Sequence, residues 1–443
     1  MIGAESAAFL TIIDASVTLN LAWRAAFFVY KPEHSVSFIE DVIRSCFAAS
    51  DNSWRGVTLI PLSERNPKQI IPPSRCQQGN TSDGLSEETN TVCARNISAA
   101  DMQAWSDLQQ SEPTSDSPFF RPEFALAVAG VRDDVEVGIV RKAQQPVCFF
   151  PFQRRSGMVA RPVGGPMSDF HGPIVRRGTK FEAASLIRDC HLVAWHFHDL
   201  VTAQHAFEPF RWSQQSAPFI EISAGYDAYC DQRREVGCKT ITQTMQKLRK
   251  LRREVGDVRF ELVTRDHCVL RQLMDWKAEQ CRGQGHLDLF SFDWVRRLMH
   301  DLLHYDQYDF SGQLAAMYAG GEIQAAFFCL RSRDVLHIWV IAHRPELAKY
   351  SPGYQLLAHL VERGSELGIR RIDLGRGSER FKTSFANGAI AVTEGSVDLR
   401  PFQRHVSRLW YQVRRGVADL PLNRSMDAPR QFAKRLRDRL LYR

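Results

Sequence analysis

The order of apolar patterns between residues 240 and 385 narrows the possible folds more than any other feature of this chain. One strand-like segment is followed by two helical ones, three consecutive strand-like segments, a helix, a short strand and a last helix. Three strands joined by short connections are typical of antiparallel neighbours, on which the flanking helices can pack. This order predicts an α+β fold. The strand segments are 258–264, 312–318, 323–330, 335–341 and 371–374, and the helical segments are 240–255, 268–282, 292–305, 352–367 and 379–385.

The preceding residues, 98–238, have a pattern of their own. A segment rich in glycine and proline, 161–173, interrupts it. We therefore expect a first unit at 98–238 and a second at 239–400, each with a sheet and helices. In the first unit the pattern predicts helices at 102–110, from Arg121 onward and from Phe181 to about Ala206, and strands at 135–141, 146–152 and 219–223.

The two ends of the chain differ from its middle. Residues 1–97 are expected to be a poorly structured extension, because 63–96 is polar, contains prolines and glycines, and lacks helical or strand periodicity. Residues 401–443 form a basic tail with a net charge of +8, against +7 for the whole chain. The rest of the chain is therefore close to neutral, which makes a nucleic-acid partner an unlikely expectation.

The cysteines and histidines do not indicate a metal site. The ten cysteines stand at irregular spacings, and no pair is separated by only two residues. His300 and His304 have the spacing of a zinc helix but lie off its apolar face. The histidines 191, 198 and 205 would share a helical face, yet stand too far apart to hold one ion. We expect reduced thiols and no metal.

Nothing in the sequence predicts a membrane span. The longest N-terminal run without a formal charge, Ala15–Trp23, falls far short of the roughly 20 residues that a spanning helix needs. We expect a cytoplasmic protein. The basic tail, which includes Trp410 and Phe432 among its arginines, could lie on the inner membrane surface, or could equally be a solvated helix.

The segment after the third consecutive strand predicts an anion site. Ser351 is a good N-cap, Pro352 suits the first helical turn, and Gly353 leaves that turn without a side chain. The start of a helix offers unpaired N–H groups and a positive dipole end, which suit a pyrophosphate. The alternative is a well-capped amphipathic helix without a ligand.

These segments resemble a known family. KYSPGYQLL at 349–357 and GIRRIDLGRGSERFK at 368–382 look like the GNAT acetyltransferases of the cellulose-biosynthesis (CelD/BcsL) type. PFFRPEF at 118–124, CFFPF at 148–152 and GGPMSDFHGP at 164–173 are similar to the first half of the same family. The resemblance covers roughly residues 98–400. It implies two GNAT-like domains with mixed, mainly antiparallel sheets flanked by helices, related to the Fem peptidyltransferases.

The resemblance also implies a ligand and site residues. Acyl-CoA, with acetyl-CoA as the family's donor, would be the co-substrate of the second half, and the first half would hold the acceptor. At the pyrophosphate loop Gly353 matches the family, whereas Tyr350 and Gln355 replace its usual Gln or Arg and its Gly or Ala. Donor contacts are expected from Ile341, Ala342, Tyr350, Ser351, Gly353, Tyr354 and Gln355.

The expected chemistry is direct attack of an acceptor amine or hydroxyl on the thioester carbonyl. Asp373 is the first candidate for the general base, with Lys382 as a second catalytic candidate. Asp169, His171 and Arg376 are candidates for acceptor binding. Each has an ordinary alternative: Asp373 could pair with a nearby arginine such as Arg376, Lys382 and Arg376 could be solvated, and Asp169 could belong to a simple turn.

Three functions follow from this pattern. The first is an acyltransferase that modifies a sugar or polysaccharide-linked acceptor in exopolysaccharide or cellulose biosynthesis. The second is a Fem-like transferase that takes its donor from aminoacyl-tRNA, since the helix at 240–255 is basic. The third is a GNAT-fold adaptor without catalysis, docked at a membrane polysaccharide synthase. Donor binding distinguishes among them.

Overall fold

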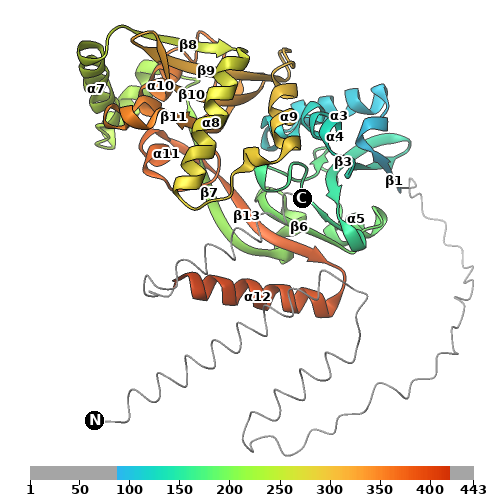
Figure 1. The fold of residues 1–443 in the computed structure, drawn as a ribbon. Coiled ribbons are helices and arrows are strands. Elements are labelled where there is room, and N and C mark those ends of the chain that lie inside the picture. Colours follow the sequence, from blue (N-terminus) through green and yellow to red (C-terminus); the bar gives the residue numbers. More distant parts are fainter. Residues whose placement is uncertain (1–86, 420–443) are drawn as a thin grey trace, which may run out of the picture. The chain divides into compact units, whose positions relative to one another are not determined.

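The computed structural model describes residues 87–419, and these have the expected α+β architecture, a mixed sheet flanked by helices (Figure 1). Residues 1–86 and 420–443, which hold most of the expected extension and part of the basic tail, lie outside the described residues. None of the helices in the described part is long and apolar enough to cross a membrane.

The first half contains β1 (Glu87–Cys93), α3 (Ala99–Ser111), α4 (Pro122–Val131), β2 (Val135–Lys142), β3 (Gln145–Arg154), β4 (Val159–Arg161), β5 (Ile174–Val175), α5 (Ala183–Asp189), β6 (Ala194–Val201), β7 (Arg211–Glu221) and α6 (Tyr226–Glu235). The second half contains α7 (Thr240–Glu254), β8 (Val258–Thr264), α8 (His267–Gly283), α9 (Asp293–Leu302), β9 (Ser311–Ala319), β10 (Glu322–Ser332), β11 (Val335–His343), α10 (Pro352–Glu362), β12 (Arg371–Asp373), α11 (Arg380–Phe385) and β13 (Gly388–Asp398), and α12 (Pro401–Asp419) follows β13.

The strands of both halves form one sheet. Its order is β1-β2-β3-β4-β6-β13-β7-β12-β11-β10-β9-β8, with β5 paired to β3 beside this path. The β4–β6 and β11–β12 pairs are parallel and the other pairs are antiparallel. The two halves exchange strands: β13 of the second half lies between β6 and β7, and β7 of the first half lies between β13 and β12 (Figure 1).

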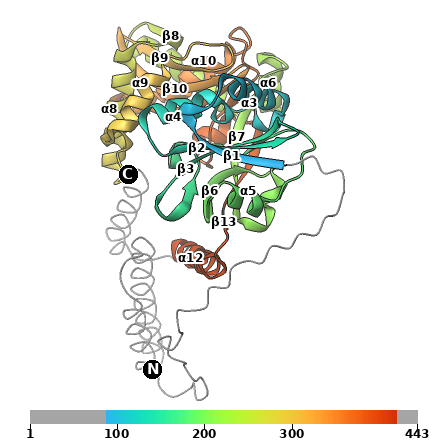
Figure 2. The same ribbon diagram turned by 90° about the vertical axis from the view of Figure 1, so that its right-hand side faces the viewer.

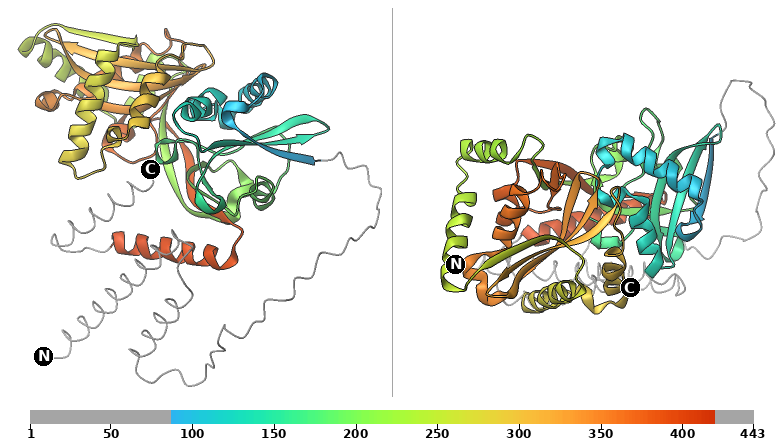
Figure 3. Two further views of the ribbon diagram at one scale, coloured as in Figure 1. Left: turned by 45° about the vertical axis from the view of Figure 1, so that its right-hand side comes forward. Right: turned by 90° about the horizontal axis from the view of Figure 1, so that it is seen from above.

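Alternation along the strands divides the core of the second half between two faces. Ala315 and Phe327 pack with α7 and α10, whereas their neighbours Ala316 and Phe328 pack with α8 and α9. These two pairs of helices cover opposite faces of the sheet (Figure 3). A fully buried phenylalanine such as Phe327 or Phe328 stabilises the fold by about 1.5–3 kcal/mol. The predicted helices and strands of this half are confirmed, with α10 ending earlier than expected, at Glu362.

Two expectations in the first half are wrong. The long helix predicted from Phe181 to Ala206 is instead α5 followed by β6, because Trp195 and Phe197 alternate with half-exposed histidines, the pattern of a strand. The predicted linker, 63–96, includes residues 87–93, which form the strand β1. The seven residues of β1 pair with β2 at the edge of the sheet (Figure 2). An edge strand of partly exposed polar residues carries little periodicity, so the sequence pattern missed it.

Candidate functional site

The sheet opens between β11 and β12. The two strands pair in parallel only from Val335 with Arg371 to His337 with Asp373. Beyond Asp373 the chain follows β7, since the amides of Leu374 and Gly377 donate to the carbonyls of Pro218 and Ser216. β11 continues alone on that side to His343. The divergence leaves a wedge between the two strands, with one edge of β11 free to bond a ligand.

A β-bulge lies at the mouth of this wedge. Across the β10–β11 pair, Phe328 stands opposite Val340 and Cys329 opposite Ile338, so Trp339 is an extra residue in β11. Its indole Nε1 donates to the carbonyl of Met167 at 2.7 Å. Bulges are frequent next to active sites because they re-aim side chains. Here the bulge ties the first-half loop at 164–173 to β11.

The amides of β11 alternate between the wedge and the neighbouring strand. The Arg344 amide donates to Gln324 at the start of β10, so the Ala342 amide also points to β10, while those of Ile341 and His343 point into the wedge. Of the two backbone contacts predicted here, Ile341 therefore faces the wedge. The Ala342 N–H is directed to β10, and a donor contact of Ala342 stays a prediction.

The start of α10 differs from the predicted cap but leaves one amide without a hydrogen-bond partner among residues 87–419. Ser351 has left-handed backbone angles (φ 57°, ψ 56°), and its side chain makes no cap; its hydroxyl instead accepts from Lys247 Nζ at 2.7 Å. The Ser351 carbonyl accepts the amides of Tyr354 and Gln355. Within residues 87–419 the Gly353 amide has no hydrogen-bond partner, and no atom lies within 4 Å of where its Cβ would be.

The other residues predicted to bind the acyl donor have side chains that point into the protein. The hydroxyl of Tyr350 donates to Glu254 at 2.6 Å, and the amide nitrogen of Gln355 donates to the Tyr350 carbonyl at 2.8 Å. Tyr354 packs edge-on against Phe381 of α11. These three residues hold α7, α10 and α11 together. Any donor contact that they make comes from backbone or from the exposed edge of the Tyr354 ring.

Asp373 is a buried member of an ion-pair network. It is fully buried, and Arg371 donates to its carboxylate from Nε at 2.8 Å and Nη2 at 3.3 Å. Arg371 also donates from Nη1 to Asp116 at 2.9 Å. Burial raises the pKa of Asp373, and Arg371 opposes that rise. The expected alternative, an ion pair with a nearby arginine, is confirmed, but the partner is Arg371, two residues away on the same strand, in place of Arg376.

Asp169 reaches the point where the strands separate. Its Oδ2 lies 2.8 Å from Nε2 of His337, the last residue of β11 that pairs with β12. A Cβ on Gly375, just past β12, would lie 2.5 Å from the same oxygen, and Gly375 has φ +69°. Asp169 therefore lies between the two diverging segments. The expectation that it belongs only to a local turn is wrong, because its partner comes from the second half.

His171 and Arg376 belong to a buried cluster on β6. Nε2 of His171 accepts the amides of His198 and Asp199 at 3.2 and 3.0 Å, and burial holds its pKa well below the usual value. Arg376 Nη1 lies 3.2 Å from Asp199 Oδ1 and donates to the His198 carbonyl. Burial raises the pKa of Asp199 to about 8 despite Arg376, and lowers that of His198 to about 4.

A cavity of about 170 Å³ adjoins Asp169. Trp339 and Val340 of β11 line one side of it, and Lys277 and Cys281 of α8 line another. Burial lowers the pKa of Lys277. The predicted catalytic Lys382 lies outside this lining; its Nζ donates to the Arg376 carbonyl at 2.6 Å and so holds the loop after β12.

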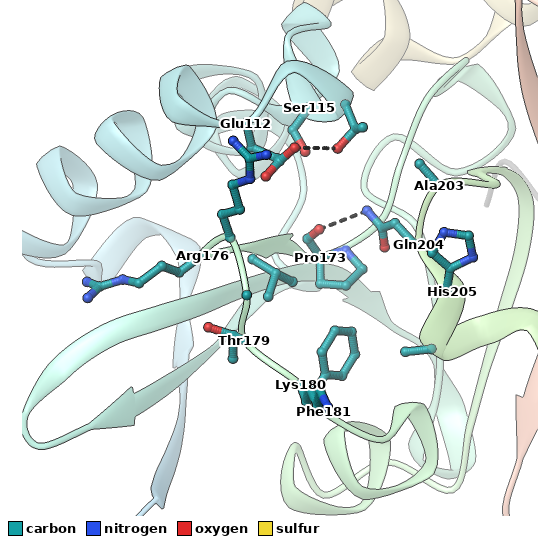
Figure 4. Close-up of a pocket in the computed structure, with 15 residues that line it drawn as sticks. Glu112, Ser115, Pro173, Arg176, Thr179, Lys180, Phe181, Ala203, Gln204 and His205 are labelled. Atoms are coloured by element: carbon teal, nitrogen blue, oxygen red, sulfur yellow. Dashed lines mark hydrogen bonds between the residues drawn. The ribbon is translucent and has the colours of Figure 1, made fainter.

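A larger cavity, of about 570 Å³, lies on the first half (Figure 4). Arg176, Arg177 and Lys180 line it together with Glu112, and Gln204 on its wall donates to the Pro173 carbonyl at 2.9 Å. None of the predicted site residues lines it. Within the part of the chain that the structure describes, no group of three or more His, Cys, Asp and Glu side chains could hold a metal.

Sequence reasoning missed His337, Asp199 and Lys277. A histidine in an apolar strand has the pattern of a core residue, and Asp199 was assigned to a helix that is not there. Lys277 stands among the polar positions of an amphipathic helix. A signal that could have found Asp199 is the alternation His196-Phe197-His198 before it, which indicates a strand.

The comparisons with known proteins support an acyltransferase. Residues 239–383 match the family model described as an acetyltransferase (GNAT) domain. This part of the chain is a GNAT acetyltransferase domain, and the wedge and the start of α10 both lie within it. The chain is therefore an acyltransferase by class. A search of the curated proteins finds no match.

Solved structures with a similar fold are distant. A tandem GNAT protein from the clavulanic acid biosynthesis pathway is 10% identical over 71% of this chain and 99% of its own, with a TM-score of 0.42. FemX is 9% identical over 73% and 99%, with a TM-score of 0.48. A GCN5-related N-acetyltransferase from Sphaerobacter thermophilus is 11% identical over 71% and 96%, with a TM-score of 0.38. At these sequence identities and TM-scores, the structural similarities are not evidence about substrates.

Proposed function

We propose that this protein transfers an acyl group from acyl-CoA, with acetyl-CoA as the first donor to test, to an amine or hydroxyl acceptor. The observation that carries the proposal is the divergence of β11 from β12 beside the open start of α10. The second half would be the donor side and the first half the acceptor side.

Two groups of the chain fit the two ends of such a donor. The Gly353 amide, with the Lys247 ammonium bonded to Ser351 next to it, suits a pyrophosphate. The Ile341 amide, on the free edge of β11, suits the thioester carbonyl, whose oxygen becomes more negative when the acceptor attacks. A donor bound between them would lie along β11 with its carbonyl close to Asp169.

The acceptor class is proposed from sequence resemblance. Segments 164–173 and 368–382 resemble the cellulose-biosynthesis type of GNAT protein, which suggests a sugar or polysaccharide-linked acceptor in exopolysaccharide or cellulose production. We also propose a cytoplasmic enzyme whose basic tail contacts the inner membrane. On α12, Phe402 and Leu409 are exposed next to Arg404 and Arg408, which supports a peripheral contact with anionic lipid.

Calorimetric titration of the full chain with coenzyme A and acetyl-CoA tests the donor. Gly353→Asp places a negative charge where the pyrophosphate is expected and should weaken binding at least about tenfold, or about 1.4 kcal/mol. The same charge in the first turn favours the helix, so folding should survive. Gly353→Ala is the matched control, because its methyl group meets no atom within 4 Å.

Three outcomes of this titration separate the candidates. Binding to the wild type that Gly353→Asp weakens and Gly353→Ala keeps supports the proposal. Equal affinity of all three proteins contradicts the α10 site. A wild type that binds neither coenzyme A nor acetyl-CoA, but retains its fold, contradicts the acyl-CoA function and favours a Fem-like transferase or an adaptor. Titration with aminoacyl-tRNA then distinguishes those two.

A further inference from the structure

Asp169 occupies the apex of the wedge, although it belongs to the other half of the chain. Its Oδ2 lies 2.8 Å from His337 Nε2, and the position of a Gly375 Cβ lies 2.5 Å from the same oxygen. The loop that carries Asp169 is held from both sides. The Trp339 indole donates to the Met167 carbonyl, and His171 binds the backbone of β6. Contacts with both halves of the chain therefore fix the position of the Asp169 carboxylate.

Among residues 87–419, one oxygen of Asp169 has a hydrogen-bond partner. Oδ2 is bonded to His337, whereas Oδ1 accepts no hydrogen bond from any residue in the described range. The side chain is 28% exposed and lines the cavity of about 170 Å³ that Trp339 and Val340 also line. A carboxylate with one oxygen anchored and the other open to a cavity can accept a proton from a molecule bound there.

His337 is suited to anchor this carboxylate and has no access to a ligand itself. It is completely buried, and the rings of Phe119 and Phe170 meet it edge-on at centroid distances of 4.9 and 5.7 Å. Its second nitrogen, Nδ1, is buried without a hydrogen-bond partner in residues 87–419. The ring is therefore fixed, and its Nε2–H can only donate to Asp169.

Asp373 lacks these properties. Both of its oxygens accept from Arg371, and the residue is fully buried. It also borders none of the four main cavities of the described residues. A base must come within hydrogen-bond distance of the proton that it removes. In this structure that condition is met at Asp169 and is not met at Asp373.

We propose that Asp169 is the catalytic residue that takes the proton from the acceptor, and that His337 is its positioning residue. This inference rests on the proposed acyl-CoA function. The acceptor's amine or hydroxyl forms a new C–N or C–O bond with the thioester carbonyl carbon. The C–S bond breaks, and its electron pair leaves with the sulfur. The acceptor's proton passes to Asp169 Oδ1 and from there to the thiolate or to solvent, so that free thiol is released.

The charged groups around Asp169 come from three elements. His337 of β11 bonds it directly, Lys277 and Cys281 of α8 line the same cavity, and the charge of Asp169 acts on His198 and Asp199 of β6. Lys277 is the other group that could take a proton in this cavity. Substituting Lys277 in parallel therefore tells the two bases apart.

The experiment measures thiol release from acetyl-CoA by the full chain, with D-glucosamine as an acceptor probe and with water alone. Asp169→Asn should lower the rate about 100-fold or more, the usual contribution of a general base, while coenzyme A binding by calorimetry stays unchanged. Asp189→Asn, an exposed carboxylate on α5, is the matched control and should keep the wild-type rate.

His337 is tested by rescue and by comparing rate with donor affinity. In His337→Phe the rate of thiol release should fall at least about tenfold while coenzyme A affinity stays unchanged, because the Asp169 carboxylate loses the N–H that holds it in place. His337→Gln keeps a donor and should recover most of the rate. A merely structural role would lower the melting temperature of both variants without this recovery of rate.

The outcomes separate this inference from the function on which it rests. If the wild type binds coenzyme A and Asp169→Asn releases thiol at the wild-type rate, however small that rate is, Asp169 is not the base. If Lys277→Met shows the 100-fold loss and Asp169→Asn does not, the base is Lys277. If the wild type does not bind coenzyme A at all, the acyl-CoA function itself fails.

Discussion

Gly375→Ala should break the hydrogen bond between Asp169 and His337 although neither of these residues is substituted. Gly375 has φ +69°, where a residue with a Cβ is strained by about 1–2 kcal/mol. Its Cβ would lie 2.5 Å from Asp169 Oδ2, although such contacts need roughly 3.5 Å, so the carboxylate must move by about 1 Å. A hydrogen bond of 2.8 Å does not survive that shift, and losing one to a charged group costs about 1.5–3 kcal/mol.

The two costs add to about 2.5–5 kcal/mol of unfolding free energy, to be measured by urea denaturation. Gly237→Ala supplies the control, because Gly237 has φ +72° and nothing within 4 Å of its Cβ position. It should lose only the strain, about 1–2 kcal/mol. Gly375→Ala should also slow thiol release from acetyl-CoA at least about tenfold, which Gly237→Ala should not. Equal losses of stability and equal rates in the two variants would refute the reasoning.

Three further predictions concern the buried charges. Asp373→Asn tests the sequence-based assignment of the base: that assignment requires turnover to fall while donor affinity holds, whereas a base at Asp169 leaves turnover close to the wild-type value, and unchanged turnover would remove Asp373 from the mechanism. Arg371→Met should cost about 3–5 kcal/mol in urea denaturation, since it leaves Asp373 buried without its partner, and adding Asp373→Asn should recover most of it; no recovery would mean that the pairing is not what stabilises β12. Because burial raises the pKa of Asp199 to about 8, the folded chain keeps a proton that the unfolded chain releases near pH 4, so stability should fall by up to about 1.4 kcal/mol per unit as the pH rises from 4 to 8. Asp199→Asn should flatten that slope in melting curves taken across the window, and an unaltered slope would argue against a protonated Asp199.

The strands of the second half could be predicted because their burial is unambiguous. β9, β10 and β11 are apolar almost throughout, and short turns separate them, so strand length and turn residues together identify them. The same reasoning failed at β6. Its leading residues continue the apolar pattern of α5, and the left-handed turn at His191 that separates them leaves no glycine or proline in the sequence.

The candidate site could be predicted only where it lies in one segment. Gly353 and Ile341 follow from the local pattern of a strand and the helix start after it. The contact between Asp169 and His337 joins residues 168 positions apart, on different halves, and no local period encodes it. Tyr350 and Gln355 show the opposite case, in which a local motif does not determine what a side chain contacts. Both lie at motif positions, yet their side chains make hydrogen bonds that hold α7 and α10 together.

The exchange of β7 and β13 explains how a carboxylate from one half can be held at a hydrogen-bond distance from the other. If the halves were joined only by a linker, the loop at 164–173 could move relative to β11, and ordering it would cost about 1–2 kcal/mol for each residue fixed. Instead, β13 pairs with β6 on one side and with β7 on the other, and β7 pairs with β12. Displacing Asp169 from His337 by a rigid movement of the halves would require breaking these ladders. Folding of the shared sheet therefore fixes the geometry of the wedge before any ligand arrives, which is the condition for a preorganised base.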